Sequence, residues 1–411
     1  MRALLRPEHL ETRDGSEAEA ILRSCVHCGF CNATCPTYQL LGDERDGPRG
    51  RIYQIKSLLE GEAITAETAS HLDRCLGCRA CETTCPSGVR YGRLLDYARP
   101  LVDEAVPRPA PERVRRWLLR RLVPSAIFPV LLALGQGLRP LLPAAIARLV
   151  PARRPAAAWP ERVHPTRYVT LEGCVQEAAR PSINAAAARV LDRGGISLLR
   201  ADGGGCCGAL AYHLGAHDEA RDCARRNIDA WWPQLRDGAE GVFSAASGCT
   251  PMLKDYGELL RDDPAYAERA RIVAARVRDA TELVTPALLG RTEGRAPTVA
   301  VQAPCSLQHG LRGAGRMEAL LGAAGCAVQT PADSHLCCGS AGAYSILQPT
   351  LAGQLLERKL DTLMAAGPQF IATSNIGCML HLEKQAQVPV LHWLEIVDAQ
   401  QSAASADFSP P

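Results

Sequence analysis

The chain carries the sequence CVHCGFCNATCP at residues 25–36, and its cysteine spacing returns as CLGCRACETTCP at residues 75–86. Each copy has three cysteines at intervals of three residues and a fourth cysteine four residues later, directly before a proline. Proline fixes its own φ angle and has no backbone N–H, so we expect it to turn the chain away from the cysteine loop. Two copies of this spacing predict two metal centres.

The spacing resembles that of two-cluster ferredoxins, in which three cysteines hold one [4Fe–4S] cubane and the fourth crosses to the other. The alternatives are zinc, whose four-cysteine sites usually come as two C-x-x-C pairs separated by a longer span, and disulfides, which fit the pattern less well. Cubane clusters move single electrons, so we expect an electron-transfer protein. The predicted ligands are Cys25, Cys28, Cys31 and Cys85 for cluster 1, and Cys75, Cys78, Cys81 and Cys35 for cluster 2.

The composition bounds the class of protein. The 411 residues correspond to two to four domains, 47% of them are hydrophobic, and the net charge of +2 gives no indication of a nucleic-acid partner. The first residues, 1–8, lack the apolar core of a secretory signal. The 18 cysteines must stay reduced to bind iron, so we expect the chain in the cytoplasm.

A segment without charges, Leu122–Leu138, follows the N-terminal motifs and is interrupted by two prolines and two glycines. Arginines precede and follow it. The pattern favours an interfacial helix, which predicts peripheral contact with the inner membrane through residues 113–154. Docking of a partner subunit, packing inside the protein and a short spanning helix are the alternatives.

Residues 166–398 contain an internal repeat. Each copy has a single cysteine, a cysteine pair followed by glycine 32 residues later, and a last cysteine 42 or 40 residues after the pair. Strands alternate with helices in both copies, which predicts α/β units with parallel sheets whose cysteines gather at the strand ends. The expected strands are 168–171, 196–199 and 241–244 in the first copy and 298–302, 327–329 and 370–373 in the second. The cysteines are Cys174, Cys206, Cys207 and Cys249, and Cys305, Cys337, Cys338 and Cys378.

The predicted fold is therefore a multidomain α+β and α/β chain, with a helical two-cluster module followed by two cysteine-rich α/β repeats. Helices are expected at 48–61, 91–98, 185–192, 218–231, 316–324 and 350–365. The expected divisions are 1–100 for the cluster module, 101–165 for a basic apolar helical connector, 166–292 and 293–398 for the repeats, and 399–411 for a flexible tail.

The repeats resemble the cysteine-rich domains of heterodisulfide reductase subunits and of related iron–sulfur subunits. Complete members of that group end each copy with C-x-x-C and can hold a noncubane [4Fe–4S] cluster, but Met252 and His381 stand at those positions here. The eight repeat cysteines are therefore candidates for a further cluster, for redox thiols, for another metal or for a structural role. His381 could replace the missing ligand, although for it, as for His27, His213, His217 and His309, a hydrogen-bonded structural role is the simpler expectation.

The order of module, connector and two repeats most resembles the family of glycolate oxidase iron–sulfur subunits. The strings DGPRGRIYQIKSLLEG, CETTCPSGVRYGRLLDYAR and QAPCSLQHG support this resemblance. It implies that FAD sits on partner subunits that oxidise glycolate, that this chain passes electrons to a membrane quinone or another acceptor, and that no residue here is catalytic. The alternatives are an iron–sulfur subunit of anaerobic glycerol-3-phosphate dehydrogenase, a heterodisulfide-reductase-like thiol/disulfide oxidoreductase and an assembly protein.

Overall fold

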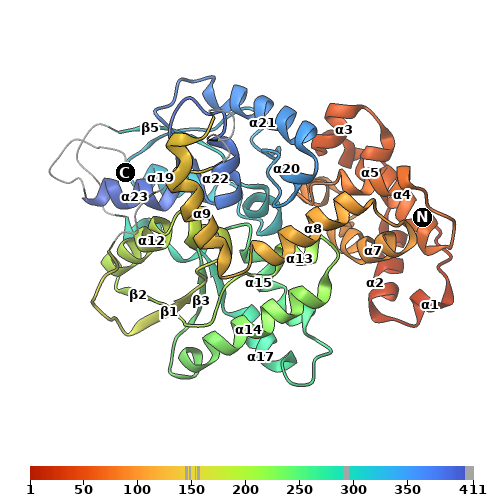
Figure 1. Ribbon diagram of the computed structural model, residues 1–411, viewed down its shortest axis with the longest axis horizontal. Coiled ribbons are helices and arrows are strands. Elements are labelled where there is room, and N and C mark those ends of the chain that lie inside the picture. The colour runs from red at the N-terminus through yellow and green to blue at the C-terminus, as the bar shows by residue number, and fades with distance from the viewer. Residues whose placement is uncertain (144–146, 148–149, 153, 155–157, 290–295, 403–411) are drawn as a thin grey trace.

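The computed structural model describes residues 1–143, 147, 150–152, 154, 158–289 and 296–402. A group of helices at one end carries both cysteine motifs, and two separate parallel sheets with their helices make up the rest (Figure 1). This confirms the predicted fold class. The division expected between residues 292 and 293, and the tail from 403 onward, lie outside the described residues, while residues 399–402 belong to the last helix.

The N-terminal module is helical. Pro36 and Pro48 are the first residues of two of its helices, where the missing N–H of proline leaves no hydrogen bond unmade. Its core contains Leu22, Ile55 and Leu94, whose side chains are fully buried. The elements are α1 (Pro7–Leu10), α2 (Arg13–Ser24), η1 (Phe30–Thr34), α3 (Pro36–Leu41), η2 (Glu44–Asp46), α4 (Pro48–Leu59), α5 (Ala66–Asp73), α6 (Ala80–Thr84) and α7 (Tyr91–Ala105).

Helix α7 is longer than the 91–98 expected from the sequence. Its buried residues Leu94, Leu95, Ala98 and Val102 form one helical stripe that continues past the expected end. Pro100 lies inside the helix, where proline normally removes a hydrogen bond and kinks the chain. Burial of the stripe outweighs that loss, because Val102 is almost completely covered by the module.

The connector forms α8 (Ala110–Leu122), α9 (Ile127–Leu138) and the short η3 (Arg139–Leu141), which cross the front of the molecule in Figure 1. No single described helix is long and apolar enough to cross a membrane. The stretches Ala110–Leu122 and Ile127–Leu141 pass that test only together, and they are bent by 100°. The pair leaves many large apolar side chains exposed: Val114, Trp117, Leu118, Leu122, Ile127, Val130, Leu131, Leu134, Leu138 and Leu141.

The first repeat is built on a parallel sheet in the order β2-β1-β3-β4. Its strands are β1 (Thr166–Thr170), β2 (Ile196–Leu199), β3 (Gly241–Ser244) and β4 (Val277–Asp279). Its helices are α11 (Cys174–Ala179), α12 (Ser182–Arg193), α13 (Ala209–His213), α14 (His217–Arg236), α15 (Thr250–Lys254), α16 (Tyr256–Leu259), α17 (Ala267–Ala275), α18 (Ala280–Leu283) and η4 (Pro286–Leu288).

The second repeat has the same topology, with the strand order β6-β5-β7-β8. Its strands are β5 (Thr298–Val301), β6 (Ala327–Gln329), β7 (Phe370–Thr373) and β8 (Val390–His392). Its helices are η5 (Ser306–Gly310), α19 (Arg316–Ala323), α20 (Tyr344–Leu347), α21 (Pro349–Met364), α22 (Ile376–Leu382) and α23 (Trp393–Ser402).

The two repeats share one hydrophobic core. Phe243 of β3 and Ile371 of β7 belong to the same cluster of buried residues. The carboxyl ends of these two strands meet, since the N–H of Ser247 donates to the carbonyl of Ser374 at 3.0 Å. Because cysteines follow both strands, the cysteine-bearing edges of the two sheets lie next to each other.

Candidate metal centres

The eight cysteines of the N-terminal motifs line two neighbouring cavities. Each cavity includes the first three cysteines of one motif and the proline-linked fourth cysteine of the other, and the first cavity also includes Cys81. This arrangement fits the crossed ligand sets expected from the spacing, although the ligand assignment itself stays a prediction. Cys25, Cys28, Cys31 and Cys85 line the first cavity, Cys35, Cys75 and Cys78 line the second, and Cys81 borders both.

The two cysteine loops share an unusual backbone conformation. The second and fourth residues after the first cysteine of each motif have positive φ angles: 55° at His27, 83° at Gly29, 62° at Gly77 and 61° at Arg79. Loops of this kind turn successive N–H groups toward one point and form anion-binding nests, which occur at many iron–sulfur sites. A thiolate-ligated cluster is such an anion, so the backbone fits it.

The separation of the sulfur atoms favours a cluster over a single ion. A tetrahedral zinc with bonds of about 2.3 Å would bring its sulfurs to roughly 3.8 Å from one another. All 18 cysteines lie in the described part of the chain, and no three of them bring their sulfurs within 4.8 Å of one another. No three motif cysteines are therefore drawn together as closely as a single tetrahedral zinc ion requires.

Tyr91 lines both cavities. Its side chain is buried, and burial together with the neighbouring Cys75 raises its pKa well above the usual value. The phenol therefore stays neutral, and the two sites share it as a common wall. Such an arrangement suits electron exchange between them.

A buried arginine faces the second cavity. The side chain of Arg51 is 1% exposed, and its Nη1 lies 3.9 Å from the Sγ of Cys35 and donates to Thr37 Oγ1 at 3.1 Å. The Nε donates to the carbonyl of His71 at 2.8 Å, and Nη2 lies 3.4 Å from Asp46 Oδ1. These contacts hold the guanidinium against a predicted cluster ligand.

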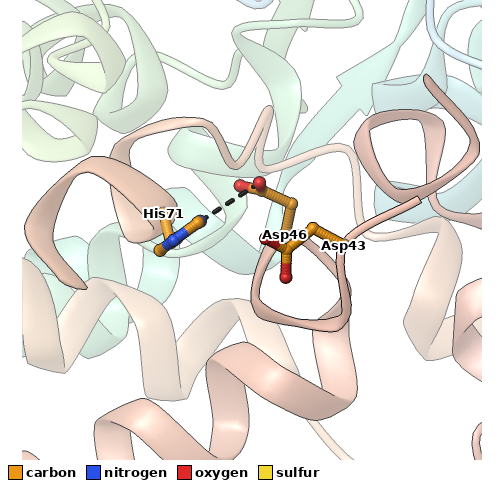
Figure 2. A group of neighbouring side chains, drawn as sticks. All are labelled: Asp43, Asp46 and His71. Carbon is orange, nitrogen blue, oxygen red and sulfur yellow. Dashed lines mark ion pairs between the residues drawn. The ribbon is translucent and has the colours of Figure 1, made fainter. Parts of the chain in front are cut away.

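Asp46 belongs to a group that also contains Asp43 and His71, whose ligand atoms lie within 4.8 Å of one another (Figure 2). The dashed line in Figure 2 joins His71 Nδ1 and Asp46 Oδ2 at 3.1 Å. Arg51 and Arg74 also contact the Asp46 carboxylate, and Asp43 is paired with Arg45. A bound cation would have to displace these arginines, so we interpret the group as an ion-pair network that positions Arg51.

The cysteine set of repeat 2 is compact and lies against the second motif, whose cysteines are predicted to hold cluster 2. The Sγ atoms of Cys305 and Cys337 are 4.0 Å apart, and Cys337, Cys338 and Cys378 are buried. Cys78 of the second motif packs with Cys337 and Cys305 in one hydrophobic cluster. Burial is the main cause that raises the pKa of Cys78, and the charge of Cys305 adds to it.

Asn375 connects the two cysteine sets. Its Nδ2 donates to Cys378 Sγ at 3.4 Å, and its Oδ1 accepts from the N–H of Gly248, the residue before Cys249, at 3.3 Å. The buried Lys359, which interacts electrostatically with Cys337, Cys338 and Cys378, donates to the carbonyls of Asp333 and Ser334. A buried cation at this position would balance the charge of thiolates.

The cysteine set of repeat 1 contains a thiol that the sequence analysis missed. Cys223 of α14 contacts Cys206, and hydrogen bonding to Cys206 is the main cause that lowers the pKa of Cys223 to about 7. Contacts with Cys174 and Cys207 help raise the pKa of Cys206, so five thiols gather here. Cys223 lies beside Gly208 in repeat 1, and the equivalent position beside Gly339 in repeat 2 is Leu355. This cysteine is therefore not part of the repeated pattern, and its spacing did not indicate it.

Two of the histidines near the cysteines, His381 and His309, make hydrogen bonds to protein groups. His381 is buried, and its Nε2 lies 3.3 Å from the carbonyl of Ala352. Burial lowers its pKa to about 4. His309 joins the two parts of the molecule, because its Nδ1 lies 2.9 Å from Thr83 Oγ1 and its Nε2 lies 3.1 Å from the carbonyl of His335. These contacts agree with the structural role expected from the sequence.

Comparison with known proteins agrees with this architecture. Residues 21–89 match the 4Fe-4S dicluster domain, and residues 168–254 and 299–383 match the cysteine-rich domain. The chain is 48% identical to the glycolate oxidase iron-sulfur subunit of Escherichia coli, over 97% of this chain and 98% of that protein. It is 30% identical to a probable glycolate oxidase iron-sulfur subunit of Bacillus subtilis, over 89% of each.

A lactate utilization protein A from Exiguobacterium is 26% identical over 55% of this chain and 94% of that protein. This match covers a much smaller part of the chain than the matches to the two glycolate oxidase subunits, which cover 97% and 89% of it. The chain belongs to the family of glycolate oxidase iron–sulfur subunits.

Proposed function

We propose that this chain accepts electrons from a partner subunit that carries FAD and oxidises glycolate to glyoxylate, and passes them to a membrane quinone or another acceptor. Oxidation of glycolate releases two electrons and two protons. When bound, the clusters would accept the electrons one at a time. The chain's own residues would hold the clusters and set their potentials.

One observation carries this proposal. Two cysteine-lined cavities that share Tyr91 as a lining residue occur in a chain that is 48% identical to a glycolate oxidase iron-sulfur subunit. Two neighbouring cluster sites make a path for electrons, whereas a single site would be enough for a cluster that only stabilises the fold. The family resemblance selects glycolate over other substrates, because the substrate itself would bind on another subunit.

The thiols of the repeats extend the same path. Cys78 of the predicted cluster 2 set packs against Cys305, and Asn375 joins the repeat 2 set to the repeat 1 set. We propose that the five-thiol set of repeat 1 holds a further iron–sulfur cluster. Iron analysis of the anaerobic protein measures this: two cubanes alone give about eight irons per chain, and each further [4Fe–4S] cluster adds about four.

The α8–α9 pair supports contact with a membrane surface. Its polar side is tied to the protein, because Arg116 of α8 contacts Asp73, while Arg113 and Arg115 are exposed beside the apolar side chains. Exposed arginines next to an apolar helix face suit an anionic lipid surface. We propose that this pair rests on the cytoplasmic face of the inner membrane; flotation with anionic vesicles tests it, and Trp117→Asp should abolish the binding.

The function is tested with the complex of this chain and its flavin-bearing partner subunits under anaerobic conditions. Addition of glycolate should produce the EPR signals of reduced cubanes, and glycerol 3-phosphate should not. A Cys207→Ser, Cys338→Ser double variant should keep glycolate-dependent reduction of the cubanes. Loss of that reduction with intact cubanes would instead favour direct thiol chemistry in the repeats, and reduction by glycerol 3-phosphate alone would assign the chain to the other dehydrogenase.

A further inference from the structure

The two cysteine motifs differ in how the rest of the molecule covers them. The second motif is enclosed by repeat 2: Leu76 is buried with Tyr344 and Leu351, and Thr83 contacts His309. In Figure 1, α20 and α21 of repeat 2 lie beside the N-terminal helices on this side. The first motif has no such cover among the described residues, and its Cys28 is exposed to solvent.

Large apolar side chains flank the exposed cysteine. Val26 is 67% exposed and Phe30 is 61% exposed, two residues before and after Cys28. Tyr53 of α4, which is 56% exposed, continues the surface, because its ring contacts that of His27 at a centroid distance of 6.5 Å. We call Val26, Cys28, Phe30 and Tyr53 the Cys28 face.

An exposed apolar patch of this kind usually marks a site of interaction. The loop is also held in place, since the N-terminal amino group donates to the carbonyl of Cys25 at 2.6 Å and His27 Nε2 lies 3.0 Å from Met1 Sδ. A fixed loop presents Val26 and Phe30 at little cost in conformational entropy. The surface is therefore suited to a protein partner.

Cys28, a predicted ligand of cluster 1, lies between Val26 and Phe30 on this face. Its position indicates a partner that exchanges electrons with the cluster. Electron transfer between proteins weakens steeply with distance, so it needs a donor and an acceptor that both reach their surfaces. Of the two predicted cluster sets, cluster 1 alone has an exposed cysteine, whereas Cys78 of cluster 2 faces the thiols of repeat 2. The covered side suits electron exit into the repeats, and the open side suits arrival.

We propose that the electron-donating partner subunit docks on the Cys28 face and delivers its electrons to cluster 1, from which they continue through cluster 2 toward repeat 2. Each transfer removes one electron from the partner's reduced cofactor and adds it to the oxidised cluster, and no bond in this chain forms or breaks. The proposal rests on the proposed function, since it needs a partner that supplies electrons.

The test uses the complex of the full chain with its partner subunits. A Val26→Asp, Phe30→Asp double variant carries charges on the face, and Val163→Asp is the matched control, because Val163 is 68% exposed and lies near the first sheet. Loss of two central apolar anchors should weaken subunit association at least about tenfold. Glycolate-driven reduction of cluster 1, followed by rapid-freeze EPR, should slow in parallel, while reduction by dithionite stays unchanged.

The double variant changes the loop that carries the cysteines and could lose cluster 1 for that reason alone. Tyr53→Asp changes the same face from α4, outside the loop, and therefore tests docking with the loop unchanged. Wild-type association and reduction rates in both variants, or equal loss in Val163→Asp, would overturn the proposal. It would also be overturned if the isolated chain formed a dimer that the double variant breaks, because the face would then join two copies. A wild-type complex that assembles through this face but is not reduced by glycolate would refute the proposed function instead.

Discussion

The Nη1 of Arg51 lies 3.9 Å from the Sγ of Cys35, and both side chains are buried. A positive charge in a region of low dielectric constant stabilises any added negative charge nearby. Reduction of a cluster adds one electron, so Arg51 should raise the reduction potential of the cluster that Cys35 is predicted to hold. Hydrogen bonds to ligand sulfur act in the same direction.

Arg51→Gln should therefore lower the potential of cluster 2, as measured by EPR-monitored redox titration. Arg49 is the matched control, because it faces Cys31 of the first set but has a side chain that is 35% exposed. Solvent screens an exposed charge, so Arg49→Gln should shift cluster 1 by less. Arg51→Lys keeps the charge and should restore most of the potential; an unchanged potential in Arg51→Gln with both clusters present would contradict the prediction.

Cys223 and Cys326 provide a second comparison. Both thiols are 8% exposed, but Cys223 contacts Cys206, whereas burial alone raises the pKa of Cys326 to about 11. If the five thiols of repeat 1 hold a cluster, Cys223→Ser should reduce the iron above about eight per chain and leave the cubane EPR signals intact. Cys326→Ser should change neither. Equal iron content in both variants would exclude Cys223 from the site.

Replacing the glycine after each cysteine pair by alanine should lower the stability of the protein, because the added Cβ would meet neighbouring atoms. Gly339 has φ of +90°, and a Cβ there would lie 2.7 Å from the carbonyl oxygen of Ala352 and 2.9 Å from the Cβ of Leu355. Gly339→Ala should destabilise repeat 2 by roughly 2–4 kcal/mol, because it adds a clash to an unfavourable φ. Gly315 has φ of +78° with nothing within 4 Å of the added Cβ.

Gly315→Ala should therefore lower the free energy of unfolding by only about 1 kcal/mol. Gly208→Ala, with contacts of 3.1 and 3.3 Å, should fall between the two. The thermal unfolding midpoints of the three variants check this order. A Gly339→Ala protein as stable as Gly315→Ala would show that α21 shifts without strain.

The sequence predicted the parts of the fold that follow a regular period. Three strands of each sheet lie within one residue or two of their expected ends, because their apolar runs are bounded by glycine and polar residues. The fourth strands, β4 and β8, have only three residues each and were not predicted. Their hydrogen bonds to β3 and β7 define them, and no local pattern of that length does so.

The site likewise contains residues that the sequence predicted and residues that only the structure identified. The spacing of the motif cysteines resembles that of two-cluster ferredoxins, and this resemblance implies the crossed sets. Arg51, Cys223 and Asn375 reach the cysteines from other elements, α4, α14 and the start of α22. Only the tertiary fold brings them there, so sequence reasoning missed all three.

The burial of His392 should make the stability of repeat 2 depend on pH. The ring is fully buried and neutral: its Nε2 lies 3.1 Å from the carbonyl of Ala245, and its Nδ1 accepts from the N–H of Leu394 at 3.3 Å. Burial lowers its pKa to about 4. In the unfolded chain the pKa returns to about 6.5, so between these values the unfolded state binds a proton that the folded state does not.

The contribution of His392 to stability is therefore fully present above about pH 6.5 and is lost progressively as the pH falls toward 4. Between about pH 7.5 and pH 5 the loss should amount to about 2 kcal/mol. His392→Gln cannot titrate, so the difference in unfolding free energy between wild type and variant, measured in urea, should shrink by that amount over this range. Comparison at equal pH cancels any acid sensitivity that the clusters give to both proteins. A difference that does not change with pH would show that the buried ring is already protonated or that acid opens repeat 2 before His392 titrates.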